Sequence, residues 1–356
     1  MLTNTTHSLP IKDKGFSLKS LVQHKFFVLL LKLILVIALG AILYHQIFGR
    51  EDLTLEKLRV EFLQHLSWQK APLLILVLIL MPLNWLFETQ KWLALMRKIE
   101  SINFYQALKV VLVGLSFSLF TPNRVGEYGG RVMMVSKKNR LYAVWATMVG
   151  ISSQWIVLVV GGWWALMGAF YMKLMPINAI LLSSLILIGG LASVLLLIIY
   201  FNLKKVVQYS AKFKWTKNWA LKMNASPFNY YTNKELIQAL MYSCIRYLIY
   251  SSQYLCLLYF FGFEASIFAT FLGILIVYLL QTGIPLPPST GLLARGNIAL
   301  LILGYLSIIE GTATAILSAT FSLWMLNVVL PSILGAFFVA RLGWNEKEQT
   351  GKIHST

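Results

Sequence analysis

The sequence predicts an all-α protein that crosses a membrane several times. Three observations support this prediction: 58% of the 356 residues are hydrophobic, only 12% are charged, and the charged residues are concentrated in short segments between long apolar blocks. Soluble domains carry about 25% charged residues, so this chain has too few charges to cover a water-facing surface. The same distribution excludes a soluble enzyme, a disordered chain and a nucleic-acid-binding protein.

Six apolar segments have the length that a transmembrane helix needs, about 20 residues. They are 26–48, 72–92, 141–171, 177–201, 236–260 and 312–340. Two further apolar blocks, 106–135 and 266–309, are each interrupted near the middle by a helix-breaking motif, TPNRVGE at 121–127 and PLPPSTG at 285–291. These motifs predict two helical arms in each block, although proline and glycine also produce simple kinks in membrane helices.

The flanking charges orient these elements. Basic residues lie at both ends of block 106–135, whereas Glu264 and Glu310 bound block 266–309. The positive-inside rule therefore places both ends of the first block in the cytoplasm and both ends of the second on the opposite side. This predicts about six full spans plus two re-entrant helical hairpins, or about eight helices by hydropathy. The order helix–hairpin–helix occurs at 72–171 and, in opposite orientation, at 236–340, which predicts an inverted repeat.

The division of the chain follows from this topology. We expect a polar cytoplasmic N-terminus at 1–25, a transmembrane domain at 26–341 with a basic cytoplasmic loop at 202–235, and a cytoplasmic tail at 342–356. The formal net charge is +18. Its basic residues, in short segments between spans, orient the helices and attract anionic headgroups.

Arg124, Glu127 and Arg131 follow the first break. A charged side chain deep in a membrane costs about 2.5–3.5 kcal/mol on insertion scales, so three together need partners, water or both. On a helix, Glu127 and Arg131 lie on one face as an i,i+4 pair, and Arg124 shares that carboxylate or binds an anion. Guanidinium groups and the free N–H groups of a half-helix both favour phosphate. A closed triad that only stabilises the hairpin is the alternative.

Two further arginines extend this candidate anion site. Arg295 follows the second break and supplies a guanidinium from the other hairpin. Arg246 lies near the middle of segment 236–260 and has no acidic neighbour on its own helix. We therefore expect its counter-charge to be Glu127 or a ligand phosphate.

Polar residues of neighbouring spans allow two interpretations. Asn84, Glu88 and Gln154 can line the same cavity, or they can simply form hydrogen bonds between helices, which is the commoner role of such residues. Lys91 is expected to extend its amine to the membrane surface and to have no further role.

The motif TPNRVGE, followed by Arg131, resembles the signature T-P-G-R-x-G-E of the lysylphosphatidylglycerol synthase transmembrane region, also called the flippase-like domain family. The resemblance extends over about 25–342 and includes a degenerate second signature at 287–296, similar to P-x-G-G-x-G-x-R-E. It implies a protein of the bacterial inner membrane that moves a lipid or a lipid-linked group between leaflets. We expect no synthase domain, because few residues follow the last span.

The family's polar residues correspond by position to Arg124, Glu127, Arg131 and Arg295. Gly296 stands where the family has a glutamate after the second arginine, and Asn123 replaces a glycine of the first motif. The missing second carboxylate argues against a mechanism that needs an acidic residue in each half, such as symmetric proton coupling.

The expected function is therefore a lipid translocase, not an enzyme, with both termini in the cytoplasm. Its expected partner is an anionic phospholipid or a polyprenyl-linked phosphate, and we expect no cofactor, no metal and no nucleic acid. Arg124, Arg131, Arg295 and Arg246 would bind the phosphate, and Glu127 would orient the arginines and is the candidate proton-coupling group. The alternatives are an integral-membrane enzyme acting on a polyprenyl phosphate or diphosphate, and an accessory subunit with a purely structural cavity.

Overall fold

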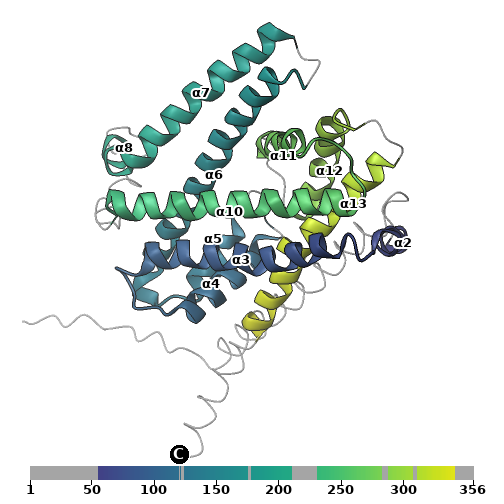
Figure 1. Ribbon diagram of the computed structural model, residues 1–356. Helices are drawn as coiled ribbons and strands as arrows, with labels where there is room; N and C mark the ends of the chain where they lie inside the picture. Colours follow the sequence, from purple (N-terminus) through teal and green to yellow (C-terminus); the bar gives the residue numbers. More distant parts are fainter. Residues whose placement is uncertain are drawn as a thin grey trace, which may run out of the picture. The chain divides into compact units, whose positions relative to one another are not determined.

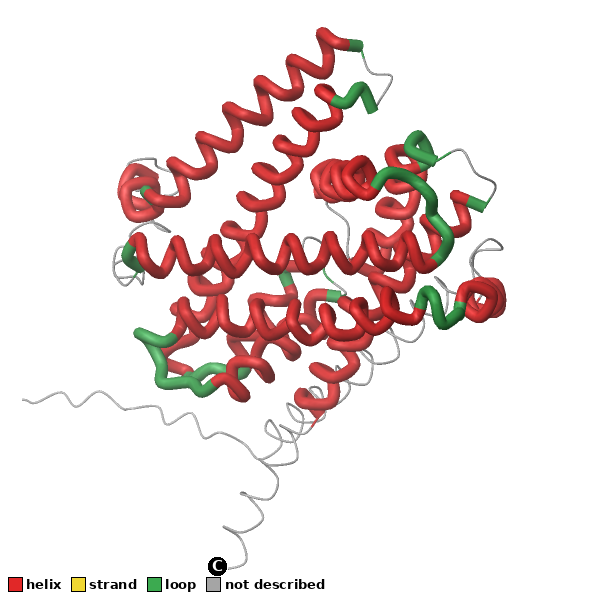
Figure 2. The backbone as a smooth tube through the Cα atoms, in the orientation of Figure 1, coloured by secondary structure: helices red, strands yellow, loops and turns green. Residues whose placement is uncertain are grey.

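The computed structural model describes residues 55–119, 121, 124–174, 178–210, 231–282, 288–307 and 311–340. These residues form α-helices joined by short loops, with no β-strand among them (Figure 2). The prediction of an all-helical chain is therefore confirmed for the described residues. The predicted N-terminus 1–25, the span 26–48, the tail 342–356 and much of the basic loop lie outside them.

Four of the described helices are long and apolar enough to cross a membrane, and they coincide with four predicted spans. They are α3 (Ala71–Met96), the segment Lys137–Tyr171 that contains α6 (Arg140–Tyr171), α7 (Ala179–Phe201) and the helix Thr312–Ala340, whose first part is α13 (Thr312–Trp324). The predicted span 236–260 forms α10 (Asn233–Phe260). This helix is long enough, but Arg246 and several serine and glutamine residues lower its hydropathy.

Both interrupted blocks contain two helices, and the second helix of each begins inside the predicted motif, at Gly126 in 121–127 and at Pro288 in 285–291. The first contains α4 (Phe104–Ser118) and α5 (Gly126–Met133), and the second contains α11 (Ile267–Thr282) and α12 (Pro288–Leu303). The arms of each block pack on each other. In the first block the backbones meet at Gly114 and Gly130, where a Cβ on Gly130 would lie only 2.8 Å from the Cα of Gly114.

The local sequence explains where two of these helices begin. Asn103 and Gln106 form a capping box at the start of α4, in which each side chain accepts a hydrogen bond from the backbone N–H of the other. Thr232 and Glu235 form the same arrangement at the start of α10. Such boxes satisfy backbone donors that have no partner within the helix.

The long helices α3 and α10 lie side by side and run in opposite directions (Figure 1). At one end, Lys70 Nζ donates a hydrogen bond to the carbonyl oxygen of Phe260 over 3.0 Å. At the other end, Lys98 Nζ lies 2.6 Å from a carboxylate oxygen of Glu235. This antiparallel pair brings the middle of α3 against the middle of α10, where the polar residues of both helices are concentrated.

Helix 312–340 crosses the α3/α10 pair obliquely (Figure 1). Its section η4 (Met325–Val329) is π-helical, and the N–H of Leu330 donates to the carbonyl of Met325, five residues earlier. Single π-helical turns inside α-helices are often found at functional sites. Here the wider turn contains Asn327, which is buried among α3 and α10.

The helices form two groups with the same order, α3–α4–α5–α6 and α10–α11–α12–helix 312–340. Each group also packs the first arm of its hairpin on the long last helix of the other group. In one case α11 packs on Gly162 and Gly168 of α6; in the other, α4 packs on Gly335. The inverted repeat across a membrane stays a prediction.

The contact at Gly335 gives a test of this packing. We expect Gly335→Ala to lower the thermal unfolding midpoint in detergent, because the new methyl group would overlap the backbone carbonyl of Leu112, which cannot rotate away. Overpacking of this kind costs about 1–3 kcal/mol. The matched control is Gly129→Ala in α5, which has no atom within 4 Å of its added Cβ. Equal midpoints for the two variants would contradict the α4–helix 312–340 contact.

Candidate functional site

The centre of the site is a buried carboxylate, Glu88 of α3, that pairs with three cations. Its Oε1 lies 2.7 Å from Arg131, and its Oε2 lies 2.8 Å from Lys91 Nζ and also pairs with Arg246. All four residues are buried. Because the cations belong to α3, α5 and α10, this one side chain joins three helices.

A second carboxylate, Glu127, lies beside the first and is also buried. It pairs with Arg131 through Oε1 and lies 3.3 Å from Arg124 Nε through Oε2. The predicted Glu127–Arg131 pair on one face of α5 is confirmed, and Arg124 also pairs with Glu127, although it lies before the helix and not on it. Arg131 therefore bridges both carboxylates.

Arg124 is the most accessible member of this cluster, with 40% of its side chain exposed. Glu127 is its one ion-pair or hydrogen-bond partner among the described residues. Its backbone has φ of 60°, in the left-handed region that non-glycine residues rarely adopt. Nearby, Thr121 Oγ1 accepts a hydrogen bond from the N–H of Gly126 over 2.6 Å and caps the start of α5. The chain thus presents Arg124 directly before a short helix.

Two expectations from the sequence are wrong. The counter-charge of Arg246 is Glu88 and not Glu127, because the antiparallel packing of α3 and α10 places residues 88 and 246 opposite each other. Arg246 also donates to Asn84 Oδ1 over 3.0 Å and to Gln154 Oε1 over 2.9 Å. Lys91 does not extend to the surface: it is 1% exposed, because α3 continues beyond it to Met96 and its amine pairs with Glu88.

A chain of amide hydrogen bonds extends the charged cluster to helix 312–340. Asn84 Nδ2 donates to Asn327 Oδ1 over 2.9 Å, and Asn327 Nδ2 donates to Gln253 Oε1 over 2.7 Å. Gln253 in turn donates to the carbonyl of Val77 over 3.0 Å. The interhelical hydrogen bonding that the sequence suggested for Asn84 is therefore present, and Asn84 also contacts the charged cluster.

Arg295 of α12 is held by neutral groups. Its Nε donates to Gln281 Oε1 and its Nη1 to the hydroxyl of Tyr250, each over 2.7 Å. Its guanidinium carbon lies 5.8 Å from the ring centre of Tyr250 and 6.0 Å from that of Tyr278. Among the described residues, no carboxylate pairs with it.

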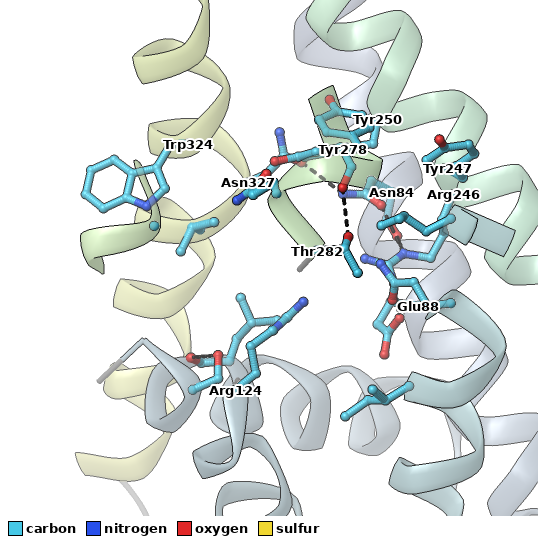
Figure 3. Close-up of a pocket in the computed structure, with 18 of the residues that line it drawn as sticks. Asn84, Glu88, Arg124, Arg246, Tyr247, Tyr250, Tyr278, Thr282, Trp324 and Asn327 are labelled. Carbon is cyan, nitrogen blue, oxygen red and sulfur yellow. Dashed lines mark hydrogen bonds and ion pairs between the residues drawn. The ribbon is translucent and has the colours of Figure 1, made fainter. Parts of the chain in front are cut away.

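A cavity of about 280 Å³ lies between the two groups of helices and receives side chains from both. Its charged lining residues are Glu88, Arg124, Glu127, Arg246 and Arg295, and its aromatic ones are Trp85, Trp155, Tyr247, Tyr250, Tyr278 and Trp324. Arg124 extends into it from the first break, while Arg246 and Glu88 lie together on the side of α10 and α3 (Figure 3). The structure thus brings four of the five predicted site residues to one cavity. The fifth, Arg131, does not line the cavity but pairs with its two carboxylates, Glu88 and Glu127.

Four polar atoms of the lining residues have no hydrogen-bond partner, although they are buried. They are the indole Nε1 of Trp85, the hydroxyls of Tyr247 and Tyr278, and Glu127 Oε2, whose one contact is the ion pair with Arg124. Buried polar groups are hydrogen-bonded in the large majority of cases. These atoms are therefore available to water or to a bound ligand.

No family model, curated protein or solved structure matches this chain. Among the described residues, no group of histidine, cysteine, aspartate and glutamate side chains is arranged to hold a metal ion. The chemistry that the site offers is that of its own side chains: excess positive charge, free hydrogen-bond donors and aromatic surface.

The sequence interpretation underestimated Glu88, although a signal was present. Asn84, Glu88 and Lys91 are spaced i, i+4 and i+7 in an otherwise apolar helix, so they form one polar stripe. A stripe of that kind in a membrane span indicates a face directed at other polar groups.

The role of Glu88 predicts a large loss of stability on neutralisation. We expect Glu88→Gln to destabilise the protein by about 3–5 kcal/mol, because cations that remain buried lose their counter-charge. The double variant Glu88→Gln/Lys91→Met should recover part of this loss, since it removes one of those cations. Thermal unfolding in detergent measures both, with Glu56→Gln on an exposed position of α2 (Leu55–His65) as the control. A single variant as stable as the control would disprove the central role of Glu88.

Proposed function

We propose that this chain is a multi-pass lipid translocase of the bacterial inner membrane, with both termini in the cytoplasm. Its substrate is an anionic phospholipid or a lipid-linked phosphate, whose phosphate group enters the cavity between the two groups of helices. The observation that carries the proposal is the charge imbalance of the site. Five cationic side chains, Lys91, Arg124, Arg131, Arg246 and Arg295, gather around the cavity with two carboxylates, Glu88 and Glu127.

A bound anion would offset the excess positive charge, and we propose Arg124 as its binding position. The other cations each have two or more partners within the protein, whereas Arg124 contacts Glu127 through Nε only, as far as the described residues are concerned. No described residue contacts its two terminal nitrogens, and guanidinium groups bind phosphate oxygens in a bidentate manner. Arg131 is then a positioning residue that fixes Glu127, while Arg246 and Arg295 contribute positive potential from the opposite wall.

The position of the cavity favours a lipid over a water-soluble anion. Trp155 lines the cavity and is 46% exposed, and it lies at the middle of α6, one of the helices able to span a membrane. We propose that the cavity opens toward hydrocarbon beside Trp155. A lipid headgroup can enter there while its acyl chains stay in the bilayer.

The repeated order of the two groups suggests how the headgroup would reach both leaflets. Each break contributes an arginine to the same cavity, Arg124 after the first and Arg295 after the second. In transporters built from inverted repeats, one repeat rocks against the other around a fixed central site. We propose the same motion here, in which the first and second hairpins alternately expose the headgroup site to each leaflet.

The proposed inverted topology predicts a labelling pattern. In a chain without Cys244 and Cys256, single cysteines at the exposed positions Arg97 and Ser136 should react with an impermeant maleimide from the cytoplasmic side only. A cysteine at the exposed position Glu264 should react from the opposite side only. Accessibility of residues 97 and 136 from opposite sides would mean that block 106–135 is a full span and would overturn the hairpin topology.

The proposed function predicts that purified protein moves lipid in vesicles. Two assays measure the fraction of lipid that reaches the outer leaflet. We expect an impermeant quencher to reach more of the acyl-chain-labelled phosphatidylglycerol than the share initially in the outer leaflet. We expect an impermeant phosphatase to hydrolyse more of the polyprenyl phosphate than that initial share. Arg124→Gln should slow transfer at least tenfold, because a hydrogen bond to a charged group contributes about 1.5–3 kcal/mol. Its unfolding midpoint should stay close to that of the wild type, since Arg124 is partly exposed and has a single partner.

The control is Arg140→Gln, which removes an exposed arginine at the start of α6. Transfer that is equal in the two variants would refute binding of phosphate by Arg124. Release of inorganic phosphate from polyprenyl diphosphate, in the absence of any added phosphatase, would support the enzyme alternative instead.

A further inference from the structure

We propose that the cavity selects lipids whose headgroup is anionic and carries no amine, that is, a phosphate substituted by hydrogen or by a hydroxylated group such as glycerol or a sugar. The inference rests on the proposed function, because it names the substrate class of that same site. It follows from an inventory of the hydrogen-bond donors and acceptors that line the cavity. An ammonium group offers donors only, whereas a phosphate offers acceptors.

The carboxylates of the cavity are already occupied by cations of the protein. Both oxygens of Glu88 are in ion pairs, one with Arg131 and the other with Lys91 and Arg246. Glu127 is in ion pairs with Arg131 through Oε1 and with Arg124 through Oε2, although Oε2 accepts no hydrogen bond. A ligand ammonium would therefore have to compete with a guanidinium or the lysine amine for each carboxylate.

The amide oxygens that line the cavity are engaged in the same way. Each accepts a hydrogen bond from a donor of the protein: Asn84 from Arg246, Gln154 from Arg246, Gln281 from Arg295, and Asn327 from Asn84. Arginine and asparagine side chains of the protein thus already donate to the amide oxygens that could otherwise accept from a ligand amine.

Two of the tyrosine rings that line the cavity offer no better place for a cation. Quaternary and primary amines can bind over the face of tyrosine or tryptophan rings. Here the rings of Tyr250 and Tyr278 already lie about 6 Å from the guanidinium of Arg295. An ammonium at this position would meet a like charge.

One carboxylate oxygen of the cavity, Glu127 Oε2, has no hydrogen bond, but it is in an ion pair with Arg124 Nε at 3.3 Å. The other buried polar atoms of the described lining without a partner, and the terminal nitrogens of Arg124, can donate: they are the indole N–H of Trp85, the hydroxyls of Tyr247 and Tyr278, and the two guanidinium nitrogens. Phosphate oxygens and sugar or glycerol hydroxyls can accept from all of them. The free donors and the excess positive charge therefore point to the same class of headgroup.

Competing lipids in identical vesicles test this selectivity. Phosphatidylglycerol, phosphatidylethanolamine and an aminoacylated phosphatidylglycerol, each labelled on an acyl chain so that its headgroup is intact, are used as tracers in neutral phosphatidylcholine vesicles. We expect phosphatidylglycerol to move at least ten times faster than either amine-bearing lipid. The variant Gln281→Glu adds a carboxylate beside Arg295 with almost no change of shape and should lower this ratio.

The outcomes separate the inference from the function on which it rests. Equal transfer of phosphatidylglycerol and phosphatidylethanolamine would overturn the selectivity and leave the translocase intact. No protein-dependent transfer of any lipid would overturn the proposed function itself. The third outcome concerns the ratio of the transfer rate of phosphatidylglycerol to that of the amine-bearing lipids. If this ratio is high in the wild type and the same in a folded Gln281→Glu protein, the lack of free acceptors is not the cause of the selectivity.

Discussion

The arrangement of the helices depends on one buried carboxylate. Glu88 is the shared partner of Lys91, Arg131 and Arg246, and a buried cation without such a partner would cost several kcal/mol. Since these cations belong to α3, α5 and α10, the helices can pack closely only with Glu88 ionised between them. The position of α5 then determines where the first break presents Arg124 to the cavity.

Glu88 and Glu127 neutralise only part of the positive charge around them. Arg131 and Arg246 each have several acceptors within the protein, whereas Arg124 has the fewest partners of these cations among the described residues. Incomplete pairing of Arg124 is compatible with folding because its side chain is partly exposed. A phosphate group bound there would complete the network. We therefore interpret the incomplete pairing as a binding feature.

The sequence predicted those parts of the fold and site that depend on neighbours in the chain. Helix lengths, the two breaks and the Glu127–Arg131 pair follow from hydropathy, from proline and glycine, and from the period of a helix. The Glu88–Arg246 pair spans 158 residues and exists only because α3 and α10 are antiparallel, a relation that no local pattern encodes. The predicted position of the Lys91 amine was wrong for the same reason. A lysine amine extends to the membrane surface when its side of the helix faces lipid, but Lys91 lies on the side of α3 that packs against other helices, where its amine contacts Glu88 and Gln154 of α6.

The two groups of helices resemble each other in order but differ in charge, and this difference determines the chemistry of the cavity. The first group supplies both carboxylates, so Arg124 and Arg131 have acidic partners on their own hairpin. In the second group Gly296 follows Arg295, and the guanidinium is held by Gln281 and Tyr250, which carry no charge. A carboxylate at position 296 would add an acidic residue directly after Arg295 and reduce the excess of positive charge. The glycine leaves the charge of Arg295 unneutralised, and this accounts for part of the excess that we assign to phosphate binding.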